Sequence, residues 1–286
     1  MSKILSIQSH VAYGYVGNRA AVFPLQRLGN EVVVVNTVQF SNHTGYGDWT
    51  GDIMSIEHID NIFIGLQKRD VFKNLDAMLT GYIGDSQLGK ILLKWLQIIK
   101  KENSRLIYCC DPVIGDVGRG VFVKLGIPEF FMNHAIKDAD ILTPNQFELE
   151  YLTQIKINNI NDALAACQSL HDKGIKVVLV TSLECDEDTK NSKIAMLVST
   201  TNEKYLIKTP KISLPISPNG SGDMTAALFL AKYLETKDLK LTLEYVASAV
   251  YGVFEITKQK EQRELAIIAA QEQLINPTNT FKAISL

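Results

Sequence analysis

The sequence contains no long hydrophobic run, no Cys-x-x-Cys pair and no excess of charge of either sign. A membrane-spanning helix needs about 18 consecutive apolar residues, and no stretch of the chain reaches that length. The residues after Met1 lack the apolar region of a signal peptide. These absences favour a cytoplasmic protein that binds no membrane. The 29 basic and 31 acidic side chains give a net charge of −2, so nucleic-acid binding has no electrostatic support.

Cysteine is scarce, and the four thiols are spaced in no metal-binding or redox motif. Cys109 and Cys110 are adjacent in a predicted strand, and Cys167 and Cys185 stand alone. Buried free thiols in a reducing compartment are the prediction. The 286 residues are 46% hydrophobic, 8% aromatic and 21% charged, which is close to average soluble usage. A chain of this length buries ~75% of its unfolded surface on folding, so it needs no metal or disulfide to fold.

Linkers rich in Pro, Gly or Ser and repeats of fixed period are also missing. We therefore predict one domain over residues 1–286. The polar stretch at residues 184–193 is the best candidate for a mobile loop.

Short β-branched apolar runs alternate with longer amphipathic ones. Strands are predicted at residues 4–8, 31–36, 77–80, 105–110, 141–142, 176–180, 194–199 and 204–208. Helices are predicted at residues 18–28, 59–68, 86–101, 146–152, 161–173, 223–234, 241–257 and 262–275. This alternation predicts an α/β fold with a mostly parallel central sheet flanked by helices on both faces. The last two strands are joined by a Thr-Thr-Asn turn, which predicts a hairpin.

The most distinctive loop is Asn219-Gly220-Ser221-Gly222-Asp223, which opens an apolar helix. Its glycines and the helix N-terminus would form a cradle of backbone amides suited to phosphate, and Asp223 could then accept a proton from an attacking hydroxyl. The alternative is an ordinary turn in which Asp223 caps the helix. The loop is neither a nucleophile elbow nor a Walker A motif, because Ser221 has glycine on both sides and no lysine is present.

Three further polar segments follow predicted strands, where parallel sheets bind ligands. Residues 143–148 read as a capping box of Asn145 and Glu148, or as a strand end that faces a divalent ion. Residues 111–116 are interpreted as an Asx-capped turn, or as a segment whose carboxylates bind a cation or act electrostatically on phosphate groups. Residues 39–47 read as a polar loop, or as the wall of a pocket for a small heteroaromatic ligand.

Together these segments resemble the pyridoxal kinases of the ribokinase-like superfamily. The resemblance rests on residues 9–21, 36–44, 81–84, 110–113, 143–148 and 220–223, which occur in the family's order. The last segment marks the superfamily, whereas residues 9–21 and 39–44 are specific to the vitamin B6 branch. The implied reaction is ATP plus pyridoxal giving ADP plus pyridoxal 5′-phosphate, in vitamin B6 salvage.

The resemblance also implies roles for particular residues. Asp223 matches the catalytic base, and Gly220, Ser221 and Gly222 match the anion hole. The pyridoxal site is implied at Ser9, His43, Thr44, Gly45 and Tyr82. The ATP site is implied at Asp111, Thr143, Asn145, Glu148, Thr181, Ser182, Lys208, Thr209, Pro210 and Lys211. Metal-associated positions are Asp116, Thr143 and Glu148. Mg²⁺, a possible monovalent cation and a homodimer are expected.

Two positions depart from some bacterial members of the family. Thr181 stands where some carry Lys, so phosphate neutralisation could differ. Val121 stands where some carry Cys, so no thiol adduct with the aldehyde forms there. Some members also lack an acid at the position of Asp116, so the resemblance implies a metal role more strongly for Glu148. The alternatives are a hydroxymethylpyrimidine or sugar kinase, a B6-binding carrier and a plain α/β binding module. Residues 9 and 40–44 disfavour a hydroxymethylpyrimidine or sugar kinase. Asp223 and the anion hole disfavour a B6-binding carrier.

Overall fold

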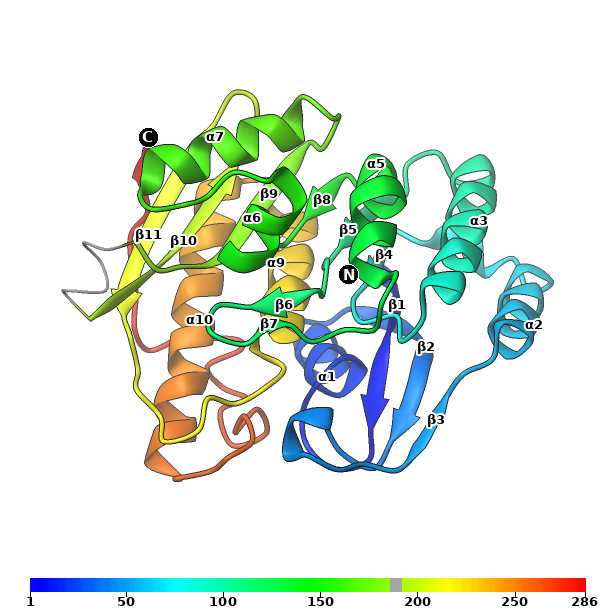
Figure 1. The fold of residues 1–286 in the computed structure, drawn as a ribbon, viewed down its shortest axis with the longest axis horizontal. Coiled ribbons are helices and arrows are strands. Elements are labelled where there is room, and N and C mark those ends of the chain that lie inside the picture. The colour runs from blue at the N-terminus through cyan, green and yellow to red at the C-terminus, as the bar shows by residue number, and fades with distance from the viewer. Residues whose placement is uncertain (186–191) are drawn as a thin grey trace.

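A ten-stranded sheet runs through the molecule in the order β12-β11-β10-β9-β8-β5-β4-β1-β2-β3 (Figure 1). The computed structural model describes residues 1–185 and 192–286. The six strands from β9 to β2 in this order pair in parallel, while β3 at one end and β10, β11 and β12 at the other pair antiparallel. This confirms the predicted α/β class and the hairpin between β10 and β11.

Eight of the sheet strands match the predicted ones to within a few residues, whereas β3 and β12 at the two ends of the sheet were not predicted. Their bounds are β1 Lys3–Val11, β2 Glu31–Phe40, β3 Gly51–Ile53, β4 Ala77–Thr80, β5 Ile107–Cys110, β8 Ile141–Leu142, β9 Val177–Leu183, β10 Lys193–Ser199, β11 Lys204–Pro210 and β12 Ile284–Ser285. A separate hairpin pairs β6 Gly115–Asp116 with β7 Gly120–Val121.

Helices cover both faces of the sheet (Figure 1). One face carries α1 Asn18–Arg27, α9 Ser221–Thr236 and α10 Leu239–Gln259. The other carries α2 Ile56–Gln67, α3 Ser86–Glu102, α6 Gln146–Thr153 and α7 Ile160–His171, together with the short helical turns α4 Ile127–Phe130, η3 Phe131–Ala135 and α5 Ile136–Asp138. The remaining 3-10 turns are η1 Thr44–Tyr46 and η2 Val71–Asn74.

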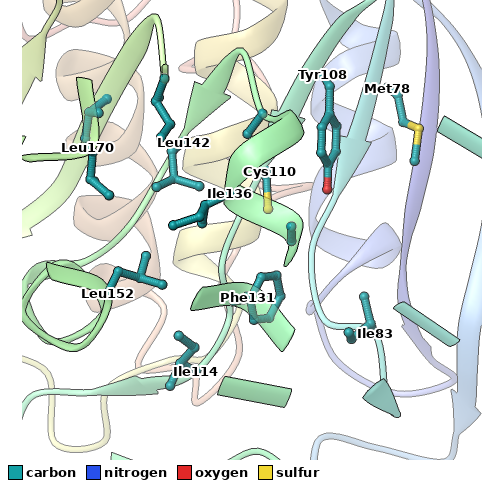
Figure 2. Packing of buried hydrophobic residues seen from close by; sticks show 14 of the residues in the cluster. Met78, Ile83, Tyr108, Cys110, Ile114, Phe131, Ile136, Leu142, Leu152 and Leu170 are labelled. Carbon is teal, nitrogen blue, oxygen red and sulfur yellow. The ribbon is translucent and has the colours of Figure 1, made fainter. Parts of the chain in front are cut away.

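Each face of the sheet has its own core, because alternate side chains of a buried strand point to opposite faces. Figure 2 shows part of one core, where Cys110 and Leu142 from the sheet face Phe131 and Ile136 from the helical turns. Cys109, the next residue along β5, belongs to the core on the other side. All four cysteines are buried and free, as predicted.

The predicted helix at residues 262–275 is wrong, because the segment forms a succession of turns. Leu265 and Ile267 are both fully buried, whereas residues two apart on a helix point to different faces. The Ala266 amide donates to Thr257 Oγ1 at 3.0 Å, and several later amides bond three residues back. Packing against α9 and α10 therefore overrides the apolar spacing of this segment.

The short elements between residues 111 and 138 went unpredicted, since two-residue strands and helical turns carry no periodic signal. Of the polar stretch at 184–193, residues 186–191 lie outside the described residues. In the described part of the chain, no helix is long and apolar enough to cross a membrane.

Candidate active site

The loop before α9 is shaped by Gly220, the N-cap residue, whose φ of 85° is left-handed. A β-carbon at this position would lie 1.9 Å from the carbonyl oxygen of Tyr15. Glycine is therefore required for this loop to pack against the loop between β1 and α1. A β-carbon on Gly222 would meet no atom within 4 Å, so the first turn of α9 is open beside its backbone amides. Such a helix N-terminus binds anions.

Asp223 lies in the first turn of α9, and Gly220 occupies the capping position. The interpretation of Asp223 as the N-cap is thus wrong. Burial raises the pKa of the Asp223 carboxyl group to about 6, and the nearby backbone amide of Gly17 lowers it in part. Burial has this effect because it disfavours the charged form. A carboxylate with a pKa near neutrality, held at an anion-binding turn, can serve as a general base.

Ser9 is connected to this aspartate through Gly17. A β-carbon on Gly17 would lie 2.2 Å from the Ser9 carbonyl oxygen, so the α1 N-terminus packs directly on β1. Ser9 is 7% exposed and lies at a register shift between β1 and β2. The structure therefore brings Ser9 and Asp223, 214 positions apart in sequence, to either side of one glycine.

The loop after β2 carries His43, Thr44 and Gly45, with Thr44 and Gly45 exposed. The His43 ring accepts a hydrogen bond at Nδ1 from the Gly45 amide at 2.9 Å. Burial, and then the charge of Arg119, lower the pKa of His43 to about 4. His43 is therefore a neutral ring at physiological pH.

Tyr82 follows β4 and is half-buried. Its ring packs against the small apolar cluster of Val11, Val16, Val38 and Phe40. Its carbonyl oxygen accepts a hydrogen bond from Thr37 Oγ1 at 2.7 Å. Strands β1, β2 and β4 are neighbours in the sheet, so Tyr82 and Ser9 lie at the same carboxyl edge.

A second group of predicted residues surrounds the N-terminus of α6. Asn145 and Glu148 form the complete capping box, so the structural interpretation is confirmed. The Glu148 carboxylate accepts hydrogen bonds from the amides of Asn145 at 2.9 Å and Ile114 at 3.0 Å. Burial raises the pKa of Glu148 to about 8, although these amides lower it in part. The capping box does not by itself decide whether Glu148 also acts on a metal.

Asp111 is 5% exposed and accepts a hydrogen bond from Thr143 Oγ1 at 3.2 Å. Burial raises the pKa of Asp111 well above its usual range, and the negative charges of Glu148 and Asp223 raise it further. Asp111 therefore lies close enough to Glu148 and to Asp223 for each of their charges to disfavour its ionised form. Asp116, on β6, accepts a hydrogen bond from the adjacent Val117 amide at 2.8 Å, whereas an Asx turn bonds the amide two residues on. Burial raises the pKa of Asp116.

The remaining predicted nucleotide residues line the ends of β9 and β11. The Thr181 amide donates to the Pro144 carbonyl oxygen at 3.0 Å, which places Thr181 and Ser182 beside the start of α6. Lys211 Nζ lies 2.6 Å from the Glu184 carboxylate. Lys208, Thr209 and Pro210 form the end of β11, and Lys211, the next residue, contacts the end of β9 through Glu184.

Four residues of the site region were absent from the predicted set. Arg119, at the tip of the β6–β7 hairpin, donates to Asn219 Oδ1 of the anion loop at 3.0 Å. In the sequence, Gly17 was noted only as part of residues 9–21 and was given no role. Arg263 and Glu264 lie in the segment predicted as a helix, so no sequence signal marked them.

The carboxyl groups of this site decide whether it suits Mg²⁺. No group of three or more His, Cys, Asp or Glu within residues 1–185 and 192–286 is arranged to hold a metal by itself. Asp111 is a buried carboxylate whose side-chain partner is one neutral hydroxyl, and such a group is stabilised by a cation. Mg²⁺ keeps several waters and binds through one or two carboxylates plus substrate phosphates. Asp111 therefore fits an ion that arrives with a nucleotide.

Comparison with known proteins gives consistent matches. Residues 32–263 match the family described as phosphomethylpyrimidine kinase. The chain is 47% identical over 278 residues to pyridoxal kinase PdxY of Rubrobacter xylanophilus, covering 97% of this chain and 95% of that protein. It is 47% identical over 284 residues to pyridoxal kinase PdxY of Granulibacter bethesdensis, covering 98% of each.

Solved structures agree with these sequence matches. Pyridoxal kinase from Leishmania donovani in complex with ADP and pyridoxamine superposes with a TM-score of 0.92 at 28% identity over 100% of both chains. Pyridoxal kinase from Entamoeba histolytica superposes with a TM-score of 0.90 at 28% identity over 100% of both chains.

Proposed function

The chain belongs to the pyridoxal kinases of the phosphomethylpyrimidine kinase family, and from this we propose that it transfers the γ-phosphoryl group of ATP to the 5′-hydroxyl of pyridoxal. The observation that carries the proposal is the Gly17 amide. This amide lies close enough to the Asp223 carboxyl group to lower its pKa, while the α-carbon of Gly17 packs on Ser9. A base, an anion-binding turn and a vitamer-facing serine thereby form one unit.

In the proposed reaction Asp223 orients the 5′-hydroxyl and accepts its proton. The 5′-oxygen bonds to the γ-phosphorus as the bond from that phosphorus to the β,γ-bridging oxygen breaks. The amides at Gly220, Ser221 and Gly222, with the positive end of α9, stabilise the charge on the transferring group. Phosphoryl transfer depends on alignment and charge stabilisation, so the chain needs no covalent intermediate.

The pyridoxal side is proposed at Ser9, His43, Thr44, Gly45 and Tyr82. Ser9 supplies a hydroxyl for hydrogen bonding to the pyridine ring. Tyr82, already supported by an apolar cluster, supplies an aromatic face. The neutral ring of His43 and the exposed Thr44 supply the polar wall of the pocket.

The nucleotide side is proposed along the ends of β5, β8, β9 and β11. Asp111, Thr143, Asn145 and Glu148 face the phosphates, and the outer residues contact the rest of the nucleotide; they are Thr181, Ser182, Lys208, Thr209, Pro210 and Lys211. Asp111, together with Asp116, Thr143 and Glu148, would hold Mg²⁺, chiefly through its waters. When bound, this ion neutralises charge on the phosphate oxygens.

We also propose that the enzyme acts in the cytoplasm as a homodimer. Partly exposed apolar side chains on and near β2 support self-association, since Val34 is 42% and Trp49 is 47% exposed. Sedimentation of the purified chain tests the homodimer, which has twice the 31.8 kDa mass of one chain.

The phosphomethylpyrimidine kinase description of the family favours hydroxymethylpyrimidine as a second candidate substrate. An ATP-consumption screen across B6 vitamers, pyrimidines and sugars separates the two. Turnover of pyridoxal with ADP and pyridoxal 5′-phosphate as products supports the proposal. Turnover of a pyrimidine or a sugar without turnover of pyridoxal contradicts it.

A further inference from the structure

Arg263 and Glu264, in the segment after α10, contact the loops that carry the proposed pyridoxal site. Glu264 Oε2 accepts a hydrogen bond from the Tyr15 amide at 2.9 Å, and Glu264 Oε1 accepts one from the Tyr46 hydroxyl at 2.7 Å. One carboxylate therefore joins the loop after β1 to the loop after β2.

Arg263 acts on the second of these loops. Its guanidinium lies 3.6 Å from the centre of the Tyr46 ring and donates to the Gly45 carbonyl oxygen at 3.0 Å. The Tyr46 ring also meets the Tyr13 ring edge-on, with centroids 6.2 Å apart. Tyr46 is thus held on three sides, next to the proposed vitamer residues Thr44 and Gly45.

The approach of Glu264 is built into the backbone. Gly14 has a left-handed φ of 97°, and a β-carbon on it would lie 2.5 Å from Glu264 Oε2. On the far side of the same loop, the Tyr15 carbonyl oxygen packs against Gly220. Glu264 therefore fixes a loop whose opposite surface abuts the anion-binding turn.

We propose that Arg263 and Glu264 are positioning residues that hold residues 13–15 and 43–46 in the geometry that binds pyridoxal. This inference rests on the proposed function and deepens it. Among the described contacts, Arg263 and Glu264 bond the loops at residues 13–15 and 43–46 and none of the proposed nucleotide-site side chains, so we expect their loss to weaken pyridoxal binding more than ATP binding. Residues that merely stabilise the fold would affect both substrates alike.

The test compares Glu264→Ala with Glu264→Gln. A glutamine accepts from the Tyr15 amide through its oxygen and donates to the Tyr46 hydroxyl oxygen through its NH₂ group. We expect Glu264→Ala to raise the KM for pyridoxal at least tenfold and the KM for ATP less than threefold, whereas Glu264→Gln stays within threefold of wild type for both. Glu272→Ala is the matched control, because Glu272 lies in the same segment but pairs with Arg27 on the surface.

Hydrogen–deuterium exchange gives a readout independent of turnover. Glu264→Ala should speed exchange in residues 13–15 and 44–47, whereas Glu272→Ala should not. If Glu264→Ala does not fold, Tyr46→Phe removes the hydroxyl alone and should still raise the KM for pyridoxal selectively. Equal increases in both KM values, an unchanged KM for pyridoxal, or unchanged exchange overturns the inference. A wild-type enzyme that does not turn over pyridoxal overturns the proposed function instead, and the exchange experiment alone then decides the positioning role.

Discussion

Asp223 is the residue on which the proposed chemistry depends most directly. Asp223→Asn keeps the size and the hydrogen-bonding capacity of the side chain but removes the base. We expect kcat to fall roughly 10²–10⁴-fold, the contribution of a positioned base, with little change in KM or in melting temperature. Steady-state kinetics and a melting curve on one preparation check this. A kcat within threefold of wild type would show that Asp223 is not the base.

The same carboxyl group predicts an acid limb in the pH profile. Burial raises the pKa of Asp223 to about 6, so the ionised base becomes the minor form below that pH. We expect kcat/KM for pyridoxal to fall about tenfold per pH unit below pH 6, since this parameter reports the free enzyme. Pyridoxal binding measured over the same range is the control. If binding falls in parallel, the limb belongs to recognition and not to the base.

Glu148 separates a structural role from a metal role. Loss of its part in the capping box costs about 1 kcal/mol or less. If the carboxylate also acts on Mg²⁺, Glu148→Gln raises the Mg²⁺ concentration needed for half-maximal activity. A Mg²⁺ titration beside a thermal melt measures both effects. A lower melting temperature with an unchanged titration would leave Glu148 as a cap alone.

At the scale of elements, two glycines at the start of α9 differ in how much space surrounds them: Gly220 is tightly packed and Gly222 is open. Gly220→Ala forces a β-carbon within 1.9 Å of the Tyr15 carbonyl oxygen at a left-handed φ, so we expect a loss of at least about 1 kcal/mol of stability together with activity. Gly222→Ala meets nothing within 4 Å and favours helix.

Gly222→Ala is the matched control for folding. It also tests whether the phosphoryl group approaches this turn closely. We expect Gly222→Ala to melt at or above the wild-type temperature while kcat/KM falls, because the added methyl group stands beside the proposed anion site. Chemical unfolding and kinetics of both variants provide the comparison. Full activity in Gly222→Ala would mean that the phosphoryl group does not approach this turn closely.

For the whole molecule, substrate preference is the decisive property. We expect pyridoxal to be phosphorylated with at least tenfold higher kcat/KM than any sugar or hydroxymethylpyrimidine. A tenfold preference needs only ~1.4 kcal/mol of differential transition-state binding, which two or three directed contacts in the pocket around Ser9 supply. Competition assays with mixed substrates measure the ratio directly. Equal efficiency for a pyrimidine would contradict the assignment of this pocket.

The sequence by itself determined the alternation of strands and helices and the glycine-rich turn before α9. Both follow from local chemistry, since apolar spacing sets the period of an element and glycine sets where the backbone turns tightly. The resemblance in residues 9–21 and 39–44 added the vitamin B6 assignment. The capping box of Asn145 and Glu148 was equally readable, because its partners are three residues apart.

Only the tertiary structure decided the features that join distant segments. The approach of Gly17 to Asp223, the Arg119–Asn219 hydrogen bond and the bonds from Glu264 to Tyr15 and Tyr46 connect residues 100 to 249 positions apart, and no local pattern encodes such pairs. The segment at 262–275 shows the reason most clearly. Its apolar spacing predicted a helix, but the surrounding elements bury Leu265 and Ile267 together and hold Glu264 at the loops, so packing set its conformation.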